Sequence, residues 1–582
     1  MKNLFKYLKP YILQILILVV FVVIQVQTDL ALPGYLSDII NEGIILQDND
    51  AILNIGLEML GVTLIGAVAS VIVGYFAARV STGVSKDVRE GIYTKILGFS
   101  TKEINKFSTA SLLTRSTNDV QQVQTVIFMF LRLVISAPIM GVGAVINAYQ
   151  KAPDLSWLIA TAVAVIFTII IAVMVFAVPK FKILQKFVDK LNRVSRENLT
   201  GLRVIRAFNT QKYELKKFDN VNKELVRINL FINKLMVFLQ PILFLIFNFL
   251  NIGVIWFGAK LLDARILEMG EMFAFVQYAS QVIMSFLMLT MVIIFLSRSM
   301  VSLQRIGEIL NTKNSVKESK KPKKFKKGSK GKIEYKEVSF TYDNSEEPVI
   351  KNISFTASPG ETTAFIGSTG SGKSTVINLL PRFYDVTKGK ILIDGIDIKD
   401  VNLKDLRDRI GYVPQKGYLF SGTIKSNLSF GKEDATEEEL KEASEIAQAY
   451  DFISDYKEKF NNPITQGGTN VSGGQKQRLS IARALIKEPD IYIFDDSFSA
   501  LDMKTDRDLR KALSKKTKES TVLIVAQKIG TIMNADKIIV LDEGKIVGEG
   551  THEELLKECK VYEEIALSQL SEEELKLKNI KQ

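Results

Sequence analysis

The chain has 582 residues, of which 47% are apolar, with 75 Lys and Arg against 63 Asp and Glu. This length predicts several compact units and excludes a single small domain. The only cysteine and the only histidine, Cys559 and His552, exclude a disulfide scaffold, a thiolate zinc site and any site that needs two imidazoles. Ten lysines lie between Lys313 and Lys332, so the net charge of +12 is a local feature and does not predict a nucleic-acid partner.

Six apolar runs in the first half are long enough to cross a bilayer as helices, which takes about 20 residues. They lie near residues 11–32, 55–80, 126–149, 155–178, 236–260 and 272–297. Runs such as YILQILILVVFVVIQVQ have no stripe of polar residues at helical spacing, which a helix packed on the core of a soluble protein would have. The sequence therefore predicts a membrane domain of six helices over residues 1–310. The first run is too long for a signal peptide and no small-residue cleavage site follows it, so we expect it to be retained.

The distribution of basic residues predicts the orientation of this domain, because cytoplasmic loops retain Lys and Arg. Residues 34–54 contain no Lys or Arg and four acids, whereas residues 79–115 and 180–234 are strongly basic. Trp157 and Trp256 fall near the outer ends of their runs, where amphipathic rings prefer to lie. We therefore expect a protein of the cytoplasmic membrane with both termini in the cytoplasm.

Two basic loops, of about 45 and 55 residues, separate the second run from the third and the fourth from the fifth. Both have helical patterns, so we expect the spans to continue as helices some 30 Å into the cytoplasm.

Polar residues inside the apolar runs are the first candidates for function. Arg132 is an intramembrane charge, which is a functional candidate, although pairing within the bundle explains it equally well. For the amides, hydrogen bonding between helices is the commoner explanation, with substrate contact as the alternative. These amides are Asn248, Asn251, Gln277 and Gln281.

Residues 311–332 form a lysine-rich linker with almost no apolar content, which predicts a segment without a core of its own. We favour a solvated tether. The alternative is attraction to anionic membrane lipids.

Residues 333–582 have the composition of a soluble α/β domain, and the apolar stretch TTAFIG leads into GSTGSGKST. A strand, a glycine loop and a helix start make a phosphate-binding loop, because backbone N–H groups surround phosphate at the positive end of the helix. Lys373 is expected to reach the β- and γ-phosphates and Ser374 to bind Mg²⁺. The predicted ATP-binding residues of this loop are Gly367, Ser368, Thr369, Gly370, Ser371, Gly372, Lys373, Ser374 and Thr375.

Two further segments complete the nucleotide chemistry. The strand IYIFDD places Asp495 where a P-loop enzyme holds Mg²⁺ through water. The residues Ser472, Gly473, Gly474 and Gln475 open a helical stretch and make a second anion site. One nucleotide cannot occupy two distant sites of one compact domain, so we expect the second site to serve a nucleotide held by another copy or a partner.

These motifs, in this order, resemble those of the ABC exporters, in which six spans precede one nucleotide-binding domain. The resemblance implies that Tyr342 stacks on adenine, that Gln415 forms the Q-loop and contacts Mg²⁺, and that VSGGQ is the signature. It also assigns SALD, which ends at Asp502, as the D-loop. It implies that the long loops end in coupling helices near 107–112 and 209–216, and that two halves work as a pair driven by ATP.

The chain departs from the family pattern at three positions. Asp496 stands where the family has a catalytic glutamate, Gln527 replaces the switch histidine, and Gln466 replaces the glutamate that often precedes the signature. Aspartate is one methylene shorter than glutamate, and a misplacement of about 1 Å can cost about 10²-fold in rate. Glutamine cannot carry a charge. Asp496, Gln527 and Lys373 are the predicted catalytic residues.

The pattern looks like the degenerate-site half of heterodimeric bacterial multidrug exporters. The expected function is ATP-driven export of an amphipathic small molecule, multidrug or lipid-like, with a second half-transporter as partner and hydrolysis mainly at the partner's site. The alternatives are a homodimeric drug or lipid exporter with an active Asp496, and an ATP-gated channel or regulatory membrane protein.

Overall fold

The computed structural model describes residues 6–326, 328–343 and 345–569. The chain folds into two compact units. Unit 1 comprises residues 1–97 and 108–312, and unit 2 comprises residues 98–107 and 313–582.

Unit 1 is entirely helical among its described residues, and six of its helical stretches are long and apolar enough to cross a membrane, as predicted. The first two are α2 (Ile12–Asp38), which continues as the π-helical η2 (Ile39–Ile44), and α3 (Asn49–Leu97). The third is a stack of α5 (Thr109–Thr114), η3 (Arg115–Asp119), α6 (Val120–Met129), η4 (Phe130–Val134) and α7 (Ser136–Lys151). The others are α8 (Ser156–Thr200), α10 (Gln211–Asp263) and α11 (Met269–Asn311).

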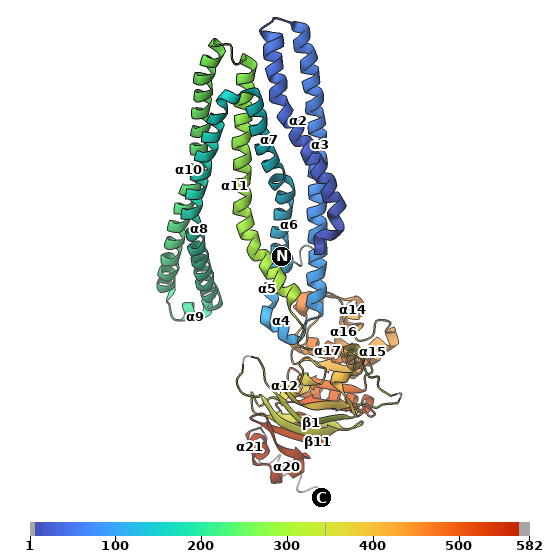
Figure 1. Cartoon of the computed structure of the whole chain (residues 1–582). Coiled ribbons are helices and arrows are strands. Elements are labelled where there is room, and N and C mark those ends of the chain that lie inside the picture. Colours follow the sequence, from blue (N-terminus) through green and yellow to red (C-terminus); the bar gives the residue numbers. More distant parts are fainter. Residues whose placement is uncertain (1–5, 327, 344, 570–582) are drawn as a thin grey trace. The chain divides into compact units, whose positions relative to one another are not determined.

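The long helices confirm that the spans continue beyond the bilayer. Helices α8 and α10 lie side by side as a hairpin joined by the short α9 (Leu202–Ala207), as Figure 1 shows. At the opposite end of this hairpin Trp157 and Phe257 pack edge to face with centroids 5.3 Å apart. The aromatic ring predicted for the outer end is therefore part of the packing between α8 and α10.

The intramembrane polar residues separate into different environments. Gln281 donates to the Asp29 carbonyl of α2 at 2.9 Å, which is the hydrogen bond between helices that its position predicted. Asn248 instead donates to Phe244, four residues earlier in its own helix. Arg132 lies in the π-helical η4 and is exposed within this chain.

Short helices lie in or beside the coupling-helix ranges expected from the family, and α5 (Thr109–Thr114) overlaps the first range. In the first loop α4 (Thr101–Phe107) ends where the expected range begins, and it belongs to unit 2. In the second loop α9 ends at Ala207, whereas residues 211–216 already belong to α10. Helical periodicity continues through both loops, so it does not reveal where Ser108 and Gly201 interrupt the helices.

Unit 2 contains two main sheets. One has the strand order β2-β1-β4-β5, formed by β2 (Ile350–Ala357), β1 (Ile333–Phe340), β4 (Lys388–Ile393) and β5 (Ile396–Asp397). The other has the order β12-β11-β3-β10-β9-β6. Its strands are β12 (Lys545–Gly550), β11 (Lys537–Asp542), β3 (Thr362–Gly367), β10 (Thr521–Val525), β9 (Ile491–Asp495) and β6 (Ile410–Val413), and all pairs except β11–β12 are parallel.

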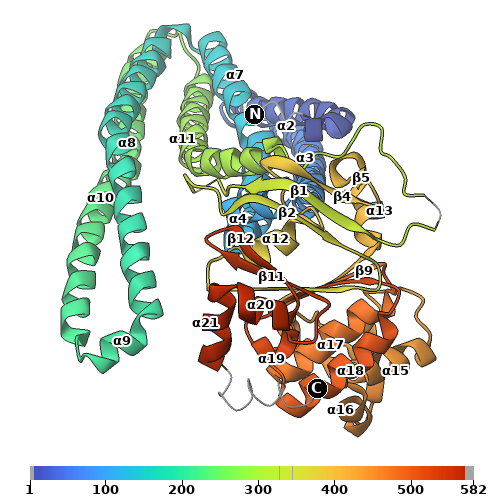
Figure 2. The ribbon, with the colours of Figure 1, turned by 90° about the horizontal axis from the view of Figure 1, so that it is seen from below.

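The five parallel strands of the six-stranded sheet are buried on both faces, which explains why they are nearly continuously apolar. In β10, Val522 and Ile524 face one core, and Leu523 and Val525 face the other. The core that contains Val522 and Ile524 also contains residues of the helices on one side of the sheet in Figure 2. The core that contains Leu523 and Val525 also contains residues of α12 (Lys373–Leu379) and of the four-stranded sheet, which we call the β1 sheet. The remaining helices are α13 (Leu403–Asp408), α14 (Ile424–Leu428), α15 (Glu437–Ile446), α16 (Tyr450–Asp455), α17 (Gly473–Ile486), α18 (Met503–Lys516), α19 (Ile529–Ile532), α20 (His552–Glu558) and α21 (Lys560–Gln569), with β7 (Gly422–Thr423) and β8 (Pro463–Ile464) as a small third sheet.

The lysine-rich linker is not a free tether. The guanidinium of Arg409 lies 4.4 Å from the ring centroid of Phe325, which packs against the core beneath the β1 sheet. The Lys323 N–H donates to the Asp400 carbonyl at 2.8 Å, and its ammonium group binds the Asp400 carboxylate. Arg382 donates to another linker carbonyl. The backbone of the linker is therefore seated on unit 2, although its lysines are mostly exposed.

Helix length also argues against the membrane-lipid interpretation of this linker. Helix α11 begins at its outer end with Met269 and needs about 20 residues to cross a 30 Å hydrocarbon core. It then continues to Asn311, about 30 Å further along its axis. Attraction to anionic headgroups falls off within a Debye length of about 8 Å, so a straight α11 along the membrane normal would place the first of these lysines beyond its range.

Helix α4 is fastened to the start of the linker by Glu103, a buried carboxylate. Its two oxygens accept hydrogen bonds from the Ser315 N–H at 3.1 Å and the Ser100 N–H at 3.1 Å, as well as from both serine hydroxyls. On the same helix Lys102 pairs with Asp343 at 2.6 Å. These contacts explain why α4 belongs to unit 2.

Replacing Glu103 with alanine removes the acceptor for these partly buried donors. We expect the free energy of unfolding of unit 2 to fall by about 1 to 3 kcal/mol, because donors left unpaired keep their desolvation cost. Thermal unfolding and limited proteolysis between α3 and α5 measure the change. Glu433→Ala, at an exposed position, is the matched control, and equal stability of the two variants would contradict the assignment.

Candidate nucleotide site

The candidate site lies where parallel strands end at one edge of the six-stranded sheet. The order β3-β10-β9-β6 brings together the phosphate loop after β3, the segment with Gln527 after β10, the acids at the end of β9, and Gln415 after β6. The carboxyl ends of parallel strands are the usual place for ligand binding in such sheets. Four motifs distant in sequence therefore meet because of strand order.

The phosphate loop has the backbone that its glycines predicted. Gly370 and Gly372 have φ of +89° and +98°, in the left-handed region that favours glycine. A Cβ on Gly367 would collide with the Leu541 carbonyl of the neighbouring β11. The loop leads directly into α12, whose first residue is Lys373.

The Lys373 ammonium group closes over this loop. It donates to the carbonyls of Gly367 at 2.8 Å and Ser368 at 2.7 Å, and it lies 3.4 Å from the Ser371 hydroxyl. Burial lowers the pKa of Lys373, while the nearby Asp496 and Asp495 oppose this shift. A phosphate group would replace these weak carbonyl partners by charged oxygens.

Ser374 and Asp495 are the residues that fit a magnesium ion. The Ser374 hydroxyl donates to Asp495 Oδ1 at 2.8 Å, so two hard oxygen ligands already face each other. Mg²⁺ in nucleotide enzymes is typically held by such ligands together with substrate phosphates and water. Burial raises the pKa of Asp495, and the hydrogen bond from Ser374 opposes it. A divalent cation would supply a positive charge to balance the negative charge of this buried carboxylate.

Asp496 is the centre of a second hydrogen-bond group. Its Oδ2 accepts from Gln415 Nε2 at 3.0 Å and from Gln527 Nε2 at 2.9 Å, while its own N–H donates to the Val525 carbonyl at 2.9 Å. Asp496 is 7% exposed and has a φ of +47°, an uncommon conformation for a residue other than glycine. We call Gln415, Asp496 and Gln527 the amide clamp.

The aromatic residue assigned to adenine lies at the side of the phosphate loop. Tyr342 shares a hydrogen bond of 3.1 Å with Thr375 Oγ1, and its ring packs edge to face against Phe340 and Tyr384. Asn105 of α4 donates to the Tyr384 hydroxyl at 3.3 Å. Thr375 of the phosphate loop contacts Tyr342 directly, and Asn105 of α4 supports it through Tyr384. We call the Tyr342 ring with these supports the Tyr342 platform.

The signature and D-loop residues stand apart from these hydrogen-bonded groups. Ser472 caps α17, accepting from Gln475 N at 3.2 Å while the Gln475 side chain accepts from Ser472 N at 2.9 Å. Asp502 caps α18 by accepting from Thr505 N, and hydrogen bonds from Thr505 lower its pKa. Gln466 lies in the short η8 (Gln466–Gly468) before the signature.

Sequence reasoning missed Gln477 and Gln569. The buried amide of Gln477, on the signature helix, donates to the Pro414 carbonyl at 3.1 Å and accepts from Gly417 N at 3.1 Å, on either side of Gln415. Gln569 binds the loop that carries Gln527. The helical period of KQRLSIARAL could have placed Gln477 on the buried face, but nothing in the sequence links Gln569 to the site.

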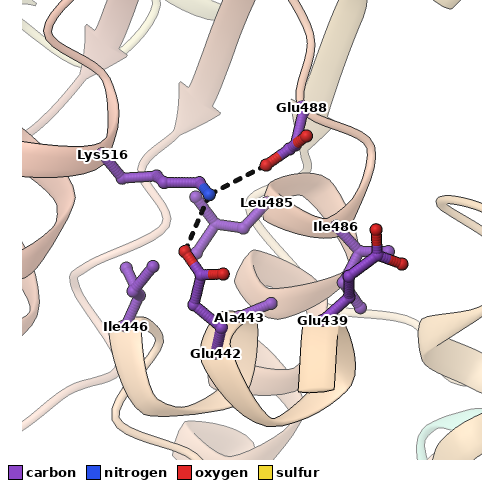
Figure 3. Close-up of a pocket in the computed structure, with 8 residues that line it drawn as sticks. All are labelled: Glu439, Glu442, Ala443, Ile446, Leu485, Ile486, Glu488 and Lys516. Atoms are coloured by element: carbon purple, nitrogen blue, oxygen red, sulfur yellow. Dashed lines mark hydrogen bonds and ion pairs between the residues drawn. The ribbon is translucent and has the colours of Figure 1, made fainter. Parts of the chain in front are cut away.

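A separate pocket on unit 2 is built around Lys516 at the end of α18 (Figure 3). The Lys516 ammonium group binds Glu442 of α15 and Glu488, which follows α17, both at 2.8 Å. These ion pairs raise the pKa of Lys516. The side chains in Figure 3 therefore brace three helices and take no part in the nucleotide site.

Fold and site together define a multi-span membrane protein with a P-loop nucleotide-binding domain. Residues 15–286 match the family model for the ABC transporter transmembrane region, and residues 350–499 match a second family model, described as ABC transporter. An uncharacterized ABC transporter ATP-binding protein of Mycobacterium tuberculosis is 38% identical over 97% of both chains, and YfiB of Bacillus subtilis, described in the same words, is 36% identical over 98% of this chain and 99% of its own. The chain belongs to the ABC transporter family.

A further relative and a solved structure are also similar to this chain. An ATP-dependent lipid A-core flippase of Desulfotalea psychrophila is 33% identical over 82% of this chain and 83% of its own. A solved structure of a bacterial Atm1-family ABC exporter with ATP bound has a TM-score of 0.82 at 22% identity, covering 97% of this chain and 99% of that one. The family confirms an ATPase that acts as a translocase and a multi-pass membrane protein whose ATPase domain is cytoplasmic.

Replacing Tyr342 with alanine tests the adenine platform. Loss of one aromatic stacking surface typically costs about 1 to 3 kcal/mol, so we expect the Kd for ATP to rise about ten-fold or more. Equilibrium binding of a fluorescent ATP analogue to the full chain in lipid nanodiscs measures it. Glu433→Ala, at an exposed position of unit 2, should bind as the wild type does. An unchanged Kd for Tyr342→Ala would place adenine elsewhere.

Proposed function

We propose that this chain is one half of a heterodimeric exporter that uses ATP to move an amphipathic compound, multidrug or lipid-like, across the cytoplasmic membrane. In this proposal its own nucleotide site holds Mg²⁺-ATP and hydrolyses it slowly. Ser472, Gly473 and Gly474 would complete the competent site of a partner that retains the glutamate and the histidine.

The observation that carries this proposal is the amide clamp. Two neutral amides converge on one oxygen of Asp496, whose side chain is already one methylene shorter than that of the usual glutamate. A general base must come within hydrogen-bond reach of the attacking water. The clamp holds the carboxylate toward Gln415 and Gln527, and Gln527 cannot add the positive charge that a protonated histidine brings to a developing phosphate charge.

Exposed apolar side chains at the tip of the α8–α10 hairpin support a partner subunit. Phe208 and Tyr213 are 76% and 70% exposed, and Leu202 and Val204 on α9 are also exposed. These residues lie at the cytoplasmic end of helices that extend well beyond the bilayer, where lipid tails cannot cover them. Several exposed apolar side chains gathered on one short segment in water favour a protein neighbour.

The substrate class is supported by the relatives. The lipid A-core flippases to which the chain is similar are named for an amphipathic lipid, and their similarity covers both halves of the chain. Export of a lipid-like compound therefore needs no element beyond those present in this chain and a partner half.

A homodimeric drug or lipid exporter is the second candidate. Among the described residues, both amides of the clamp bind Oδ2 of Asp496, so Oδ1 is the oxygen available to act as a base. In a homodimer both nucleotide sites would contain Asp496 and Gln527, and both would have to hydrolyse ATP at a useful rate.

Steady-state ATP hydrolysis by the purified chain in nanodiscs separates these candidates. We expect the chain alone to bind ATP but to turn over at least about 100-fold more slowly than its Asp496→Glu, Gln527→His double variant, because the variant restores the reach of the base and the charge. Lys373→Ala in both backgrounds sets the level of contaminating activity. Wild-type turnover equal to that of the double variant would overturn the slow site and favour the homodimer.

Transport in proteoliposomes tests the remaining alternative. Export requires ATP-dependent movement of a fluorescent lipid or dye when a partner half is present. Ion conductance that ATP opens without such movement would instead assign the chain to the channel class.

A further inference from the structure

The amide of Gln569 binds the loop between β10 and α19, and both of its polar atoms are used. Its Nε2 donates to the backbone carbonyl of Gln527 at 2.8 Å, and its Oε1 accepts from the backbone N–H of Ile529 at 2.8 Å. The two bonded backbone groups bracket Lys528. One side chain therefore holds the backbone on both sides of the residue that follows Gln527.

Helix α21 carries Gln569 on a rigid support. Tyr562 and Ala566 on this helix are fully buried in the core beneath the six-stranded sheet. The Tyr562 hydroxyl lies 2.7 Å from His552 Nδ1 of α20, which ties the two helices together. Residues 562, 566 and 569 are spaced by four and three, so they share one face of the helix. The face that anchors α21 is the face that presents Gln569.

Other contacts fix the segment on either side of Gln527: Ala526 N donates to the Phe365 carbonyl, and Arg510 of α18 donates to the carbonyls of Gly530 and Thr531. Helix α19 has only four residues, and its N-cap residue Lys528 makes no side-chain hydrogen bond to the helix. The first N–H groups of any helix lack a partner within the helix, and Gln569 supplies one for Ile529. Gln527 itself is exposed.

This backbone contact is directly connected to the reacting carboxylate. The residue whose carbonyl accepts from Gln569 is the residue whose side chain donates to Asp496 Oδ2 at 2.9 Å. Moving the Gln527 carbonyl rotates the base of its side chain, and an amide donor loses most of its bond when its direction changes. A shift of α21 would therefore move Gln527 and change its hydrogen bond to Asp496.

We propose that Gln569 is a positioning residue for ATP hydrolysis, which orients Gln527 and, through it, Asp496. Helix α21 then helps to position the groups of the nucleotide site. This role depends on the ATPase activity of the family and holds whether the chain pairs with itself or with a different half.

The alternative is that Gln569 only caps α19 and stabilises the fold. Gln569→Glu distinguishes the two roles, because glutamate keeps an acceptor for Ile529 N but cannot donate to the Gln527 carbonyl. Gln569→Ala removes both bonds. Ser568→Ala is the matched control, since the Ser568 hydroxyl donates to the Ile565 carbonyl of its own helix.

The experiment measures hydrolysis of radiolabelled Mg²⁺-ATP by the full chain in nanodiscs, in single-turnover and steady-state conditions. Each variant is made in the wild-type chain and in the Asp496→Glu chain, so that a rate is measurable even when the natural site is slow. We expect both Gln569 variants to lower kcat about ten-fold with KM within about two-fold of the parent. Ser568→Ala should match the parent. Glutamate behaving like the parent while alanine loses activity would reduce Gln569 to a cap and overturn the proposal.

A double-variant comparison with Gln527→Ala tests the route. If Gln569 acts through Gln527, then Gln569→Ala causes no further loss of kcat once the Gln527 side chain is gone. Multiplying losses, or a lower Tm with an unchanged kcat, would overturn the proposal. Fast turnover by the wild-type chain would contradict the proposed slow site. The ratio of kcat between the Gln569 variants and their parent would still decide this inference.

Discussion

Strand β10 lies between β3 and β9, parallel to both, and the nucleotide site depends on this pairing. Its register sets Val525 beside Phe365 on one side and Asp495 on the other. Because side chains of a strand alternate between faces, a slip of one residue would exchange the two cores on either side of the sheet. The burial of both faces therefore fixes the register, and the register fixes where the phosphate loop, the acids and Gln527 meet.

The arrangement at this edge would allow one family scaffold to hold a nucleotide while hydrolysing it slowly, as the proposed function requires. Binding groups and reacting groups come from different strands: the phosphate loop follows β3, whereas Asp496 and Gln527 follow β9 and β10. Substitutions at the second set leave the first intact. Lys373 and Ser374 keep their contacts even though Asp496 is shorter than the usual glutamate. Affinity and rate are thus separable in this fold.

Much of the fold was predictable because its signals are local. Six apolar runs specify six spans, and the glycines of the phosphate loop specify a backbone that only glycine adopts easily. The bounds of the short helices α4 and α9 were not predictable, because Ser108 and Gly201 interrupt patterns that are otherwise helical. The linker was misread since composition does not reveal that Arg409 stacks on Phe325. The role of Gln569 was not predictable because its partners are backbone atoms about 40 residues away in the sequence.

The chain passes between the two units three times, since residues 98–107 belong to unit 2 although both of their neighbours belong to unit 1. A protein that begins near residue 313 would contain every nucleotide motif but would lack α4. Ser315 would lose the Glu103 carboxylate, Asp343 would lose Lys102, and the Tyr384 hydroxyl would lose Asn105. The ATPase domain is therefore discontinuous in sequence, and the ring predicted to stack on adenine is supported by a segment that lies more than 200 residues earlier in the chain.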